Sequence, residues 1–240
     1  MSTLSLIFDQ VLYRPLFNGL VFLYNVLPGH DFGIAIIILT ILIRILFYPL
    51  FQKSIKAQKE MADLQPKIKE VQEKYKKDKE KQARAVMEIY KEHKVNPLSG
   101  CLPILIQLPI LYAFFQVLRT GLDPAKLNGL YSFINNPGIL NPIFLGMVSL
   151  SAPNAVLAVL TGITQFVQGK MVAPKSSPSA NKSDFASAMS AQMVYFMPIF
   201  IAFIALKLPA GLSLYWTILN LFGIAQQYFT IKKKRAEIAN

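Results

Sequence analysis

The sequence predicts an all-α polytopic membrane protein, with five transmembrane helices around a hydrophilic groove that opens to the cytoplasm. Hydrophobic residues make up 53% of the 240 residues and charged residues only 16%, whereas soluble domains carry about 25% charged residues. The mean hydropathy is +0.40. The charges also gather in a few segments and leave long apolar stretches between them, which are long enough to cross a bilayer as helices.

The predicted spans are these apolar stretches, residues 32–51, 98–119, 154–172, 191–207 and 212–231. A helix of about 19 residues rises about 28 Å, close to the thickness of the hydrocarbon core. The last two spans are separated only by residues 208–211, LPAG. Proline and glycine there stop one helix and let the next begin, so these two spans form a tight hairpin.

Basic residues give the predicted spans an orientation. Thirteen of the 25 lie in residues 52–97, three lie in or near residues 173–190, and four lie in the nine-residue tail 232–240. The positive-inside rule therefore places the N-terminus outside and the C-terminus in the cytoplasm. The net charge of +12 then mainly reflects topology. Nucleic-acid binding is the weaker interpretation, although the cytoplasmic clusters could contact ribosomal RNA.

Residues 1–31 precede the first span and have an amphipathic rhythm. Apolar side chains recur at helical spacing over residues 4–12, against Asp9, Gln10 and Arg14. The apolar part that follows, residues 15–28, has only 14 residues including its two terminal prolines, which is short for a span. This predicts an external helix in the headgroup plane. A sixth span over residues 15–28 is the alternative that the sequence leaves open.

Residues 52–97 form the largest hydrophilic segment, with thirteen basic and eight acidic residues. Apolar side chains recur at helical spacing on both sides of a polar break at residues 76–80, which predicts a cytoplasmic helical hairpin. Its 46 residues exceed what a connector needs. Residues 120–153, rich in Asn, Pro and Gly, are predicted as an external loop, and residues 173–190 as a flexible cytoplasmic loop.

Polar side chains interrupt four of the predicted spans. Thr40 and Arg44 of the first span are four residues apart and share a helix face. The other candidate groove residues are Gln107 in the second span, Thr164, Gln165 and Gln168 in the third, and Tyr215, Trp216, Thr217 and Asn220 in the fifth; the same stripes contain Thr161, Ser213 and Gln227. Any one of them could simply join two helices by a hydrogen bond worth about 0.6–2 kcal/mol. Stripes on three helices together with an arginine instead predict a wet cavity.

Arg44 is the strongest single signal in these spans. An arginine at the centre of a bilayer costs about 2.5–3.5 kcal/mol on insertion scales, and it cannot lose its proton to avoid that cost. The five predicted spans contain no Asp or Glu that could pair with it. We therefore expect Arg44 to face water in a groove open to the cytoplasm and to the bilayer, where its charge can bind a negative group.

Several ordered segments resemble the YidC/Oxa-type family of membrane protein insertases. They are GIAIIILTILIRILFYPL in the first span, LQPKI in the hairpin, KVNPLSGCLPILIQLPI entering the second span, and FMPIF with PAGLSLYW around the last turn. The resemblance covers nearly all of the chain from Phe32 onward. It implies five helices around a positively charged groove, an amphipathic helix outside and a helical hairpin in the cytoplasm.

The resemblance also implies roles for individual residues. The groove arginine of the family falls on Arg44, and a functionally sensitive threonine one turn earlier falls on Thr40. A groove glutamine falls on Gln165, with Gln168 as the alternative. The aromatic pair at the start of the last span falls on Tyr215 and Trp216.

The chain departs from the larger members of the family in two respects. It shows no large external domain and no N-terminal lipobox, so it is expected to be a minimal bacterial-type member. The tail 232–240 has only nine residues, whereas some members bind ribosomes through long basic tails, so ribosome binding by that route is not expected here. The lack of a transit peptide favours a multi-pass protein of the bacterial plasma membrane over an organellar one.

The expected function is that of an insertase and membrane chaperone. A nascent segment with a short acidic tail would enter the groove, Arg44 would attract the tail, and the apolar part would slide into lipid along the first and fifth helices. Burial of the client's own apolar helix drives the process, and no phosphate-binding glycine loop indicates ATP use. Neither enzyme activity nor a cofactor is expected. The expected partners are nascent membrane proteins and the bilayer, with the Sec translocon and the ribosome as further candidates, and the chain is expected to be a monomer.

Two other function classes stay open on the sequence. A transporter or channel could use the groove, although coupled carriers usually need intramembrane carboxylates and often contain half-repeats. A non-catalytic assembly factor could clasp other membrane proteins through the hairpin, and it would tolerate loss of the charge of Arg44.

Overall fold

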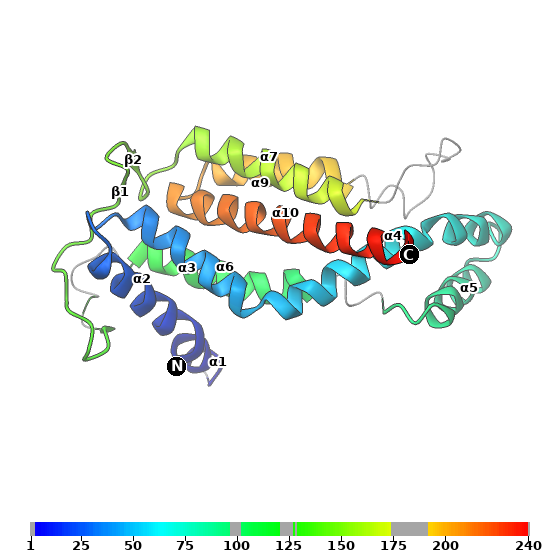
Figure 1. Cartoon of the computed structure of the whole chain (residues 1–240), viewed down its shortest axis with the longest axis horizontal. Helices are drawn as coiled ribbons and strands as arrows, with labels where there is room; N and C mark the ends of the chain where they lie inside the picture. Colours follow the sequence, from blue (N-terminus) through cyan, green and yellow to red (C-terminus); the bar gives the residue numbers. More distant parts are fainter. Residues whose placement is uncertain (1–2, 97–101, 121–126, 128, 174–191, 240) are drawn as a thin grey trace.

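The computed structural model is predominantly helical and describes residues 3–96, 102–120, 127, 129–173 and 192–239. In chain order its elements are α1 (Thr3–Phe8), the π-helix η1 (Asp9–Tyr13), α2 (Arg14–Val26), α3 (Phe32–Leu46), α4 (Tyr48–Lys74), α5 (Lys79–Glu92), α6 (Leu102–Thr120), β1 (Ile143–Phe144), β2 (Val148–Ser149), α7 (Ala155–Val172), the π-helix η4 (Gln192–Phe196), α9 (Met197–Ala205) and α10 (Ala210–Ala239). The helix α10 lies in the middle, between the pair α7 and α9 and the pair α3 and α6 (Figure 1). The α4–α5 hairpin lies at one end of this bundle, and the strands lie at the other.

The predicted first span, residues 32–51, is two helices rather than one. The helix α3 ends at Leu46 and α4 begins at Tyr48, with a bend of 70° between them. Pro49 lies in the first turn of α4. A proline lacks an N–H, and its ring collides with the carbonyl four residues earlier if a helix continues through it. The prediction of one helix through residue 51 is therefore wrong, and the end of the apolar run forms the start of α4.

The other predicted spans each contain a helix with shifted ends. Residues 98–119 contain most of α6, residues 154–172 contain α7, and residues 191–207 contain η4 followed by α9. The helix α10 does not end at residue 231 but continues through the basic tail, because Lys, Arg, Ala and Glu all favour helix. The predicted loop 173–190 lies, from residue 174 onward, outside the described residues.

Two of the described helices are long and apolar enough to cross a membrane, namely Ser5–Val26 and Ala155–Val172. The bent pair α3 and α4 would count as a third, and Leu105–Arg119 and Val194–Ala205 are apolar but shorter. The count of five spans therefore stays a prediction. The length and composition of Ser5–Val26 also keep open whether the N-terminal helix spans the membrane.

Two separate apolar clusters hold the described part of the chain together. The larger one joins α2, α3, α6 and α10, with Phe32 and Tyr215 among its largest fully buried side chains. The smaller one lies within the hairpin, where Leu64 of α4 packs with Ile89 of α5 and with Val95. The hairpin therefore has a small core of its own.

Side chains of α2 bind the backbone of the loop between α6 and α7. Asn18 Oδ1 accepts a hydrogen bond from the Tyr131 N–H at 2.7 Å, and its Nδ2 lies 3.4 Å from the Gly129 carbonyl oxygen. Asn25 Nδ2 donates to the Asn135 carbonyl at 2.7 Å. The loop is thus fixed along the length of α2.

Asp31 fastens the same loop to the start of α3. One carboxylate oxygen caps the helix by accepting from the N–H groups of Gly33 and Ile34, at 2.8 and 3.0 Å. The other oxygen accepts from the Leu145 N–H at 2.6 Å. The ring of Phe144 packs directly on Gly33, where a Cβ atom would collide with it. The β1–β2 hairpin can lie this close to α3 only because residue 33 is glycine.

Candidate functional site

Polar side chains run between α3, α7 and α10, all of them buried except the half-buried Gln168, and most of the predicted groove residues are among them. Their spacing of three or four residues places those of each helix on one face. We call this set the polar seam; its members are Thr40 and Arg44 of α3, Thr161, Thr164 and Gln168 of α7, and Thr217 and Asn220 of α10.

The helices α7 and α10 meet through hydroxyl and amide groups of the polar seam. Thr161 Oγ1 lies 3.0 Å from both the Thr217 hydroxyl and the Ser213 carbonyl oxygen. Asn220 Nδ2 donates to Thr164 Oγ1 at 3.1 Å. This half of the polar seam therefore packs helices together, the role that polar side chains most often have inside membrane bundles.

Arg44 lies where α3, α4 and α10 meet. Its Nη2 donates to the Leu219 carbonyl at 3.1 Å, and its guanidinium carbon lies 4.3 Å from the centroid of the Phe51 ring. Only 5% of the residue is exposed. The prediction that Arg44 faces water is therefore wrong for this conformation, because a backbone carbonyl and an aromatic face surround the guanidinium.

The charge of Arg44 nevertheless has no carboxylate partner in the described part of the chain. None of the ion pairs between described side chains includes it. Its Nε is buried and has no hydrogen-bond partner. The guanidinium is thus buried, but only some of its N–H groups have a hydrogen-bond partner.

Gly223 of α10 gives Arg44 and Gln168 a common neighbour. A Cβ atom at this position would overlap the side-chain amide of Gln168 and would lie 3.6 Å from Arg44 Nη2. The side chains of Gln168 and Arg44, from two different helices, therefore both approach α10 where Gly223 has no side chain. Of the two glutamines that the sequence left open, the geometry brings Gln168 to the arginine, while Gln165 is half-buried elsewhere on α7.

Tyr215 and Gln107 join α6 to α10 and do not line the polar seam. Tyr215 is fully buried, and its ring stacks on Phe114 with centroids 4.2 Å apart. Its hydroxyl accepts a hydrogen bond from Gln107 Nε2 at 2.6 Å. Their predicted place in an open groove does not hold in this conformation. Trp216 is half-buried at the edge of the same apolar core.

A polar contact that the sequence did not predict holds the start of α4 against α10. Gln226 Nε2 donates to the Tyr48 carbonyl at 3.1 Å, and the Thr230 hydroxyl donates to Gln52 Oε1 at 2.9 Å. We call these four residues the α4–α10 clamp; it holds Phe51 over the guanidinium. Gln226 and Thr230 are four residues apart on α10 and so share a helix face. This spacing could have indicated the contact, but residues 48–51 were predicted to belong to the first span.

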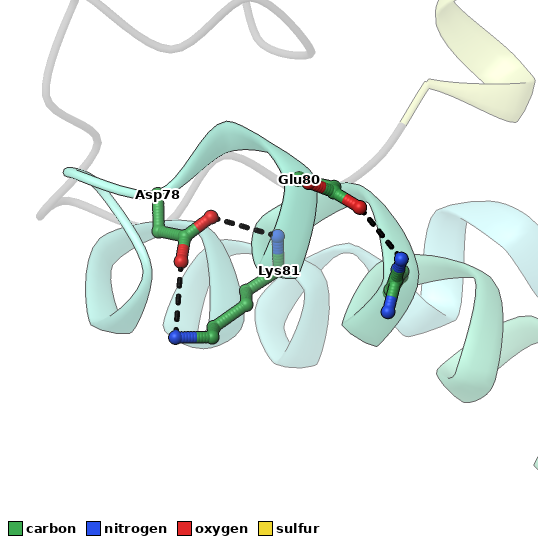
Figure 2. A network of polar contacts seen from close by, with 4 residues as sticks. Asp78, Glu80 and Lys81 are labelled. Atoms are coloured by element: carbon green, nitrogen blue, oxygen red, sulfur yellow. Dashed lines mark hydrogen bonds and ion pairs between the residues drawn. The ribbon is translucent and has the colours of Figure 1, made fainter.

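Local charge pairs hold the tip of the hairpin (Figure 2). The Asp78 carboxylate caps α5 by accepting from the Lys81 N–H at 3.0 Å and pairs with Lys81 Nζ at 3.1 Å. Arg84 pairs with Glu80 at 2.6 Å. The backbone hydrogen bond from Lys81 lowers the pKa of Asp78, and burial raises the pKa of Tyr90. The tip is therefore shaped by capping and pairing along α5.

Comparison with known proteins gives a consistent set of relatives. A family model described as "60Kd inner membrane protein" matches residues 22–237. The chain is 40% identical over 224 residues to "Membrane protein insertase YidC" of Fusobacterium nucleatum, which covers 92% of this chain and 98% of that protein. It is 38% identical over 225 residues to the protein of the same name from Geotalea daltonii, covering 93% of this chain and 38% of that protein. For the one from Syntrophus aciditrophicus, the identity is 39% over 224 residues and the covered share of that protein is 36%. The chain thus spans nearly the whole length of the first relative and under two fifths of the other two.

Proposed function

The chain belongs to the 60Kd inner membrane protein family, the YidC/Oxa-type family, and from this premise we propose that it is a membrane protein insertase and chaperone. The relatives that carry the name of insertase support this function. In this proposal it is a multi-pass protein of the bacterial plasma membrane. It guides nascent transmembrane segments into the bilayer along the polar seam, without ATP.

The observation that carries the proposal is the charge of Arg44 inside the bundle. A buried guanidinium stays protonated, and an unpaired charge in this position costs free energy. Its Nε has no partner, and no carboxylate pairs with it among the described side chains. A carboxylate of a client would neutralise the charge and bind the guanidinium through parallel hydrogen bonds. We therefore assign to Arg44 the binding of acidic tails.

Access of a client to Arg44 requires movement of the first turn of α4. Phe51 covers the guanidinium, and the α4–α10 clamp holds that turn in place. The bend of 70° between α3 and α4 is a site where a few backbone dihedrals can redirect α4. Release of the clamp would open the polar seam towards the hairpin end of the bundle. This open state is the proposed groove.

The apolar part of the client leaves along α3 and α10. Leu42 and Leu46 of α3 and Leu221 of α10 are exposed apolar side chains on these helices, and Trp216 is half-buried on α10. Burial of the client helix in lipid supplies the free energy. An inside-negative potential adds about 2.3 kcal/mol per acidic charge per 100 mV if that charge crosses the whole field.

Contacts of α2 with the α6–α7 loop support an interfacial position for the N-terminal helix. Asn18 in the middle of α2 and Asn25 near its end both bind the loop backbone. If α2 crossed the membrane, this irregular segment would follow it into the hydrocarbon core, where lipid-exposed irregular backbone does not occur. We therefore favour five spans with α2 in the headgroup plane over a sixth span.

Reconstitution in liposomes tests the proposed function. The purified protein alone should insert a small single-span client, offered in two versions whose translocated tails carry either Asp and Glu or Asn and Gln. Arg44→Lys keeps the charge and should retain much of the insertion of the acidic client. Arg44→Met keeps the volume without the charge and should lose most of it, with a smaller loss for the neutral client. Arg119→Met, at an exposed arginine near the end of α6, is the matched control.

Each outcome bears on a different part of the proposal. Failure of the wild-type protein to insert either client would contradict the insertase function. Full activity of Arg44→Met would favour an assembly factor that needs no charge in the bundle. Equal losses for both clients would mean that Arg44 hydrates the groove and does not bind the tail.

A further inference from the structure

Residues 127–154, which make up most of the loop between α6 and α7, lack the charges of a water-exposed segment. Residues 127–154 contain no Asp, Glu, Lys, Arg or His. At the usual fraction of about 25%, a segment of this length would carry about seven charged residues. By contrast, residues 52–97 carry thirteen basic and eight acidic residues. The two ends of the bundle therefore present very different surfaces.

Large apolar side chains of this loop are exposed. The exposed fractions are 74% for Phe133, 73% for Ile139, 57% for Leu145 and 81% for Met147. Tyr131 is also exposed and lies beside Phe133, with ring centroids 5.6 Å apart. Clustered apolar exposure is uncommon on surfaces that face water, and tyrosine is enriched at membrane–water interfaces.

Polar contacts hold the loop so that these side chains stay outside the core. Backbone N–H groups of the loop donate to side chains of the N-terminal region at three places: Tyr131 to Asn18 Oδ1, Asn141 to the Tyr24 hydroxyl, and Leu145 to Asp31 Oδ2. The neighbouring residues Ile134, Leu140 and Leu150 are buried in the main apolar core. The loop thus buries one set of apolar side chains and presents a second set outward.

The surroundings of the loop indicate what covers its exposed apolar side chains. The loop lies at the end of the bundle opposite the α4–α5 hairpin (Figure 1). It is bound to α2, which exposes Phe22 and Val26, and it leads directly into α7, which exposes Val156 in its first turn. The exposed apolar side chains of the loop therefore adjoin helices whose own outer faces are apolar.

From these observations we propose that residues 129–154 sit in the headgroup–acyl boundary of the leaflet at this end of the bundle, and with α2 form an interfacial collar. In the proposed orientation this is the outer leaflet. Lipid is the occupant because residues 127–154 contain no charged group, whereas protein interfaces surround an apolar centre with a polar rim. The proposal does not depend on the insertase function, since it concerns only how the loop meets the bilayer.

Spin labels on the full chain in vesicles of phosphatidylethanolamine and phosphatidylglycerol test the proposal. Single cysteines replace Phe133, Ile139 or Met147 in a Cys101→Ser background, and Lys77 at the hairpin tip is the water-exposed reference. Ser132, next to Phe133, is the matched polar position in the loop. Collision rates with oxygen and with a water-soluble nickel chelate then report depth. The ratio of oxygen to nickel collisions should be severalfold higher at the three apolar positions than at Lys77, and Ser132 should lie closer to the reference.

Two results would overturn the proposal. One is a collision ratio at all three apolar positions within about twofold of the ratio at Lys77. The other is free access to the nickel chelate in pure lipid together with protection in native membranes, which would assign the surface to a protein partner. Each labelled protein is first compared with the wild type by circular dichroism and detergent elution. Leu145 takes the place of any position whose label disturbs the fold.

Discussion

Arg44 combines near-complete burial with a charge that has no carboxylate partner in the described part of the chain, two properties that usually exclude one another. Because burial of such a charge costs free energy, we expect Arg44→Met to unfold at the same temperature as the wild type or higher. The substitution gives up one hydrogen bond to Leu219 and a ring contact with Phe51, each worth about 1–2 kcal/mol. Thermal unfolding in detergent measures the difference. A sharp fall in the unfolding temperature, absent in Arg119→Met, would show that the arginine is well paired within the fold.

Gly162 is the residue that lets α7 approach α9. A Cβ atom there would lie 2.8 Å from the Ala202 Cβ and 3.2 Å from the Pro198 carbonyl oxygen. Gly162→Ala should therefore destabilise the protein by about 1–3 kcal/mol through overpacking.

Gly19 of α2 is a helical glycine with room beside it and makes the matched control for Gly162. The nearest atom to its added Cβ would be a Leu39 methyl at 3.4 Å. Gly19→Ala should be neutral or stabilise by up to about 1 kcal/mol, since alanine favours helix over glycine. Chemical unfolding in detergent compares the two variants. Equal effects would mean that close packing at Gly162 does not hold α7 to α9.

The helix α4 belongs to two parts of the molecule. Its first two turns pack on the bundle, where Ser54 and Ile55 are buried, and the rest of it forms the hairpin core with α5. A deletion that respects this division removes residues 59–95 and closes the gap with a short Gly/Ser linker. The bundle should then unfold at nearly the wild-type temperature, because the hairpin core contributes little to it, while insertion of clients should fall severalfold. Insertion at the wild-type level would reduce the hairpin to a connector.

The capping of α5 by Asp78 gives the hairpin a dependence on pH. The pKa of Asp78 is lowered in the folded protein from an ordinary value of 3.8, through its hydrogen bond to the Lys81 backbone. Its contribution is therefore fully present above that ordinary value and is lost as the pH falls through the lowered one. The protection of amide hydrogens in the first turn of α5, measured against the intrinsic exchange rate at each pH, should fall in acid. Asp78→Asn, which keeps an acceptor without a titrating group, should remove the acid dependence, and Asp78→Ala should exchange faster at every pH. Unchanged exchange in Asp78→Ala would contradict the cap.

At the scale of the whole molecule, the proposed orientation places the α6–α7 loop and the N-terminus on one side and the hairpin tip on the other. In a Cys101→Ser background, cysteines at Thr3 and Asn136 should react with an impermeant maleimide added to intact cells. A cysteine at Lys77 should react only after permeabilisation. The physical reason is the clustering of basic residues on the cytoplasmic side. If Asn136 reacted from outside and Thr3 only from inside, α2 would cross the membrane and the chain would have six spans.

Local sequence patterns were sufficient to predict most of the helices. Apolar runs and helical spacing predicted the helices α6, α7 and α10 and the two helices of residues 52–97, because hydropathy and the period of 3.6 residues depend only on near neighbours in the chain. The resemblance of several ordered segments to the YidC/Oxa-type family is confirmed by the family match over residues 22–237. The spacing of Thr217 and Asn220 placed them on one face of α10, although both are buried and not, as expected, in a wet cavity. Sequence could reach these features because each of them lies within one helix.

The surroundings of the key residues came only from packing between helices. Whether Arg44 meets water, a carboxylate or the Phe51 ring depends on the bend at residue 47 and on how α4 lies against α10. The burial of Tyr215 and the approach of Gln168 to Gly223 depend in the same way on helix rotation and distance. One sequence pattern is compatible with many crossings of its helices. The choice among them is made by contacts between residues far apart in the chain, which no local pattern encodes.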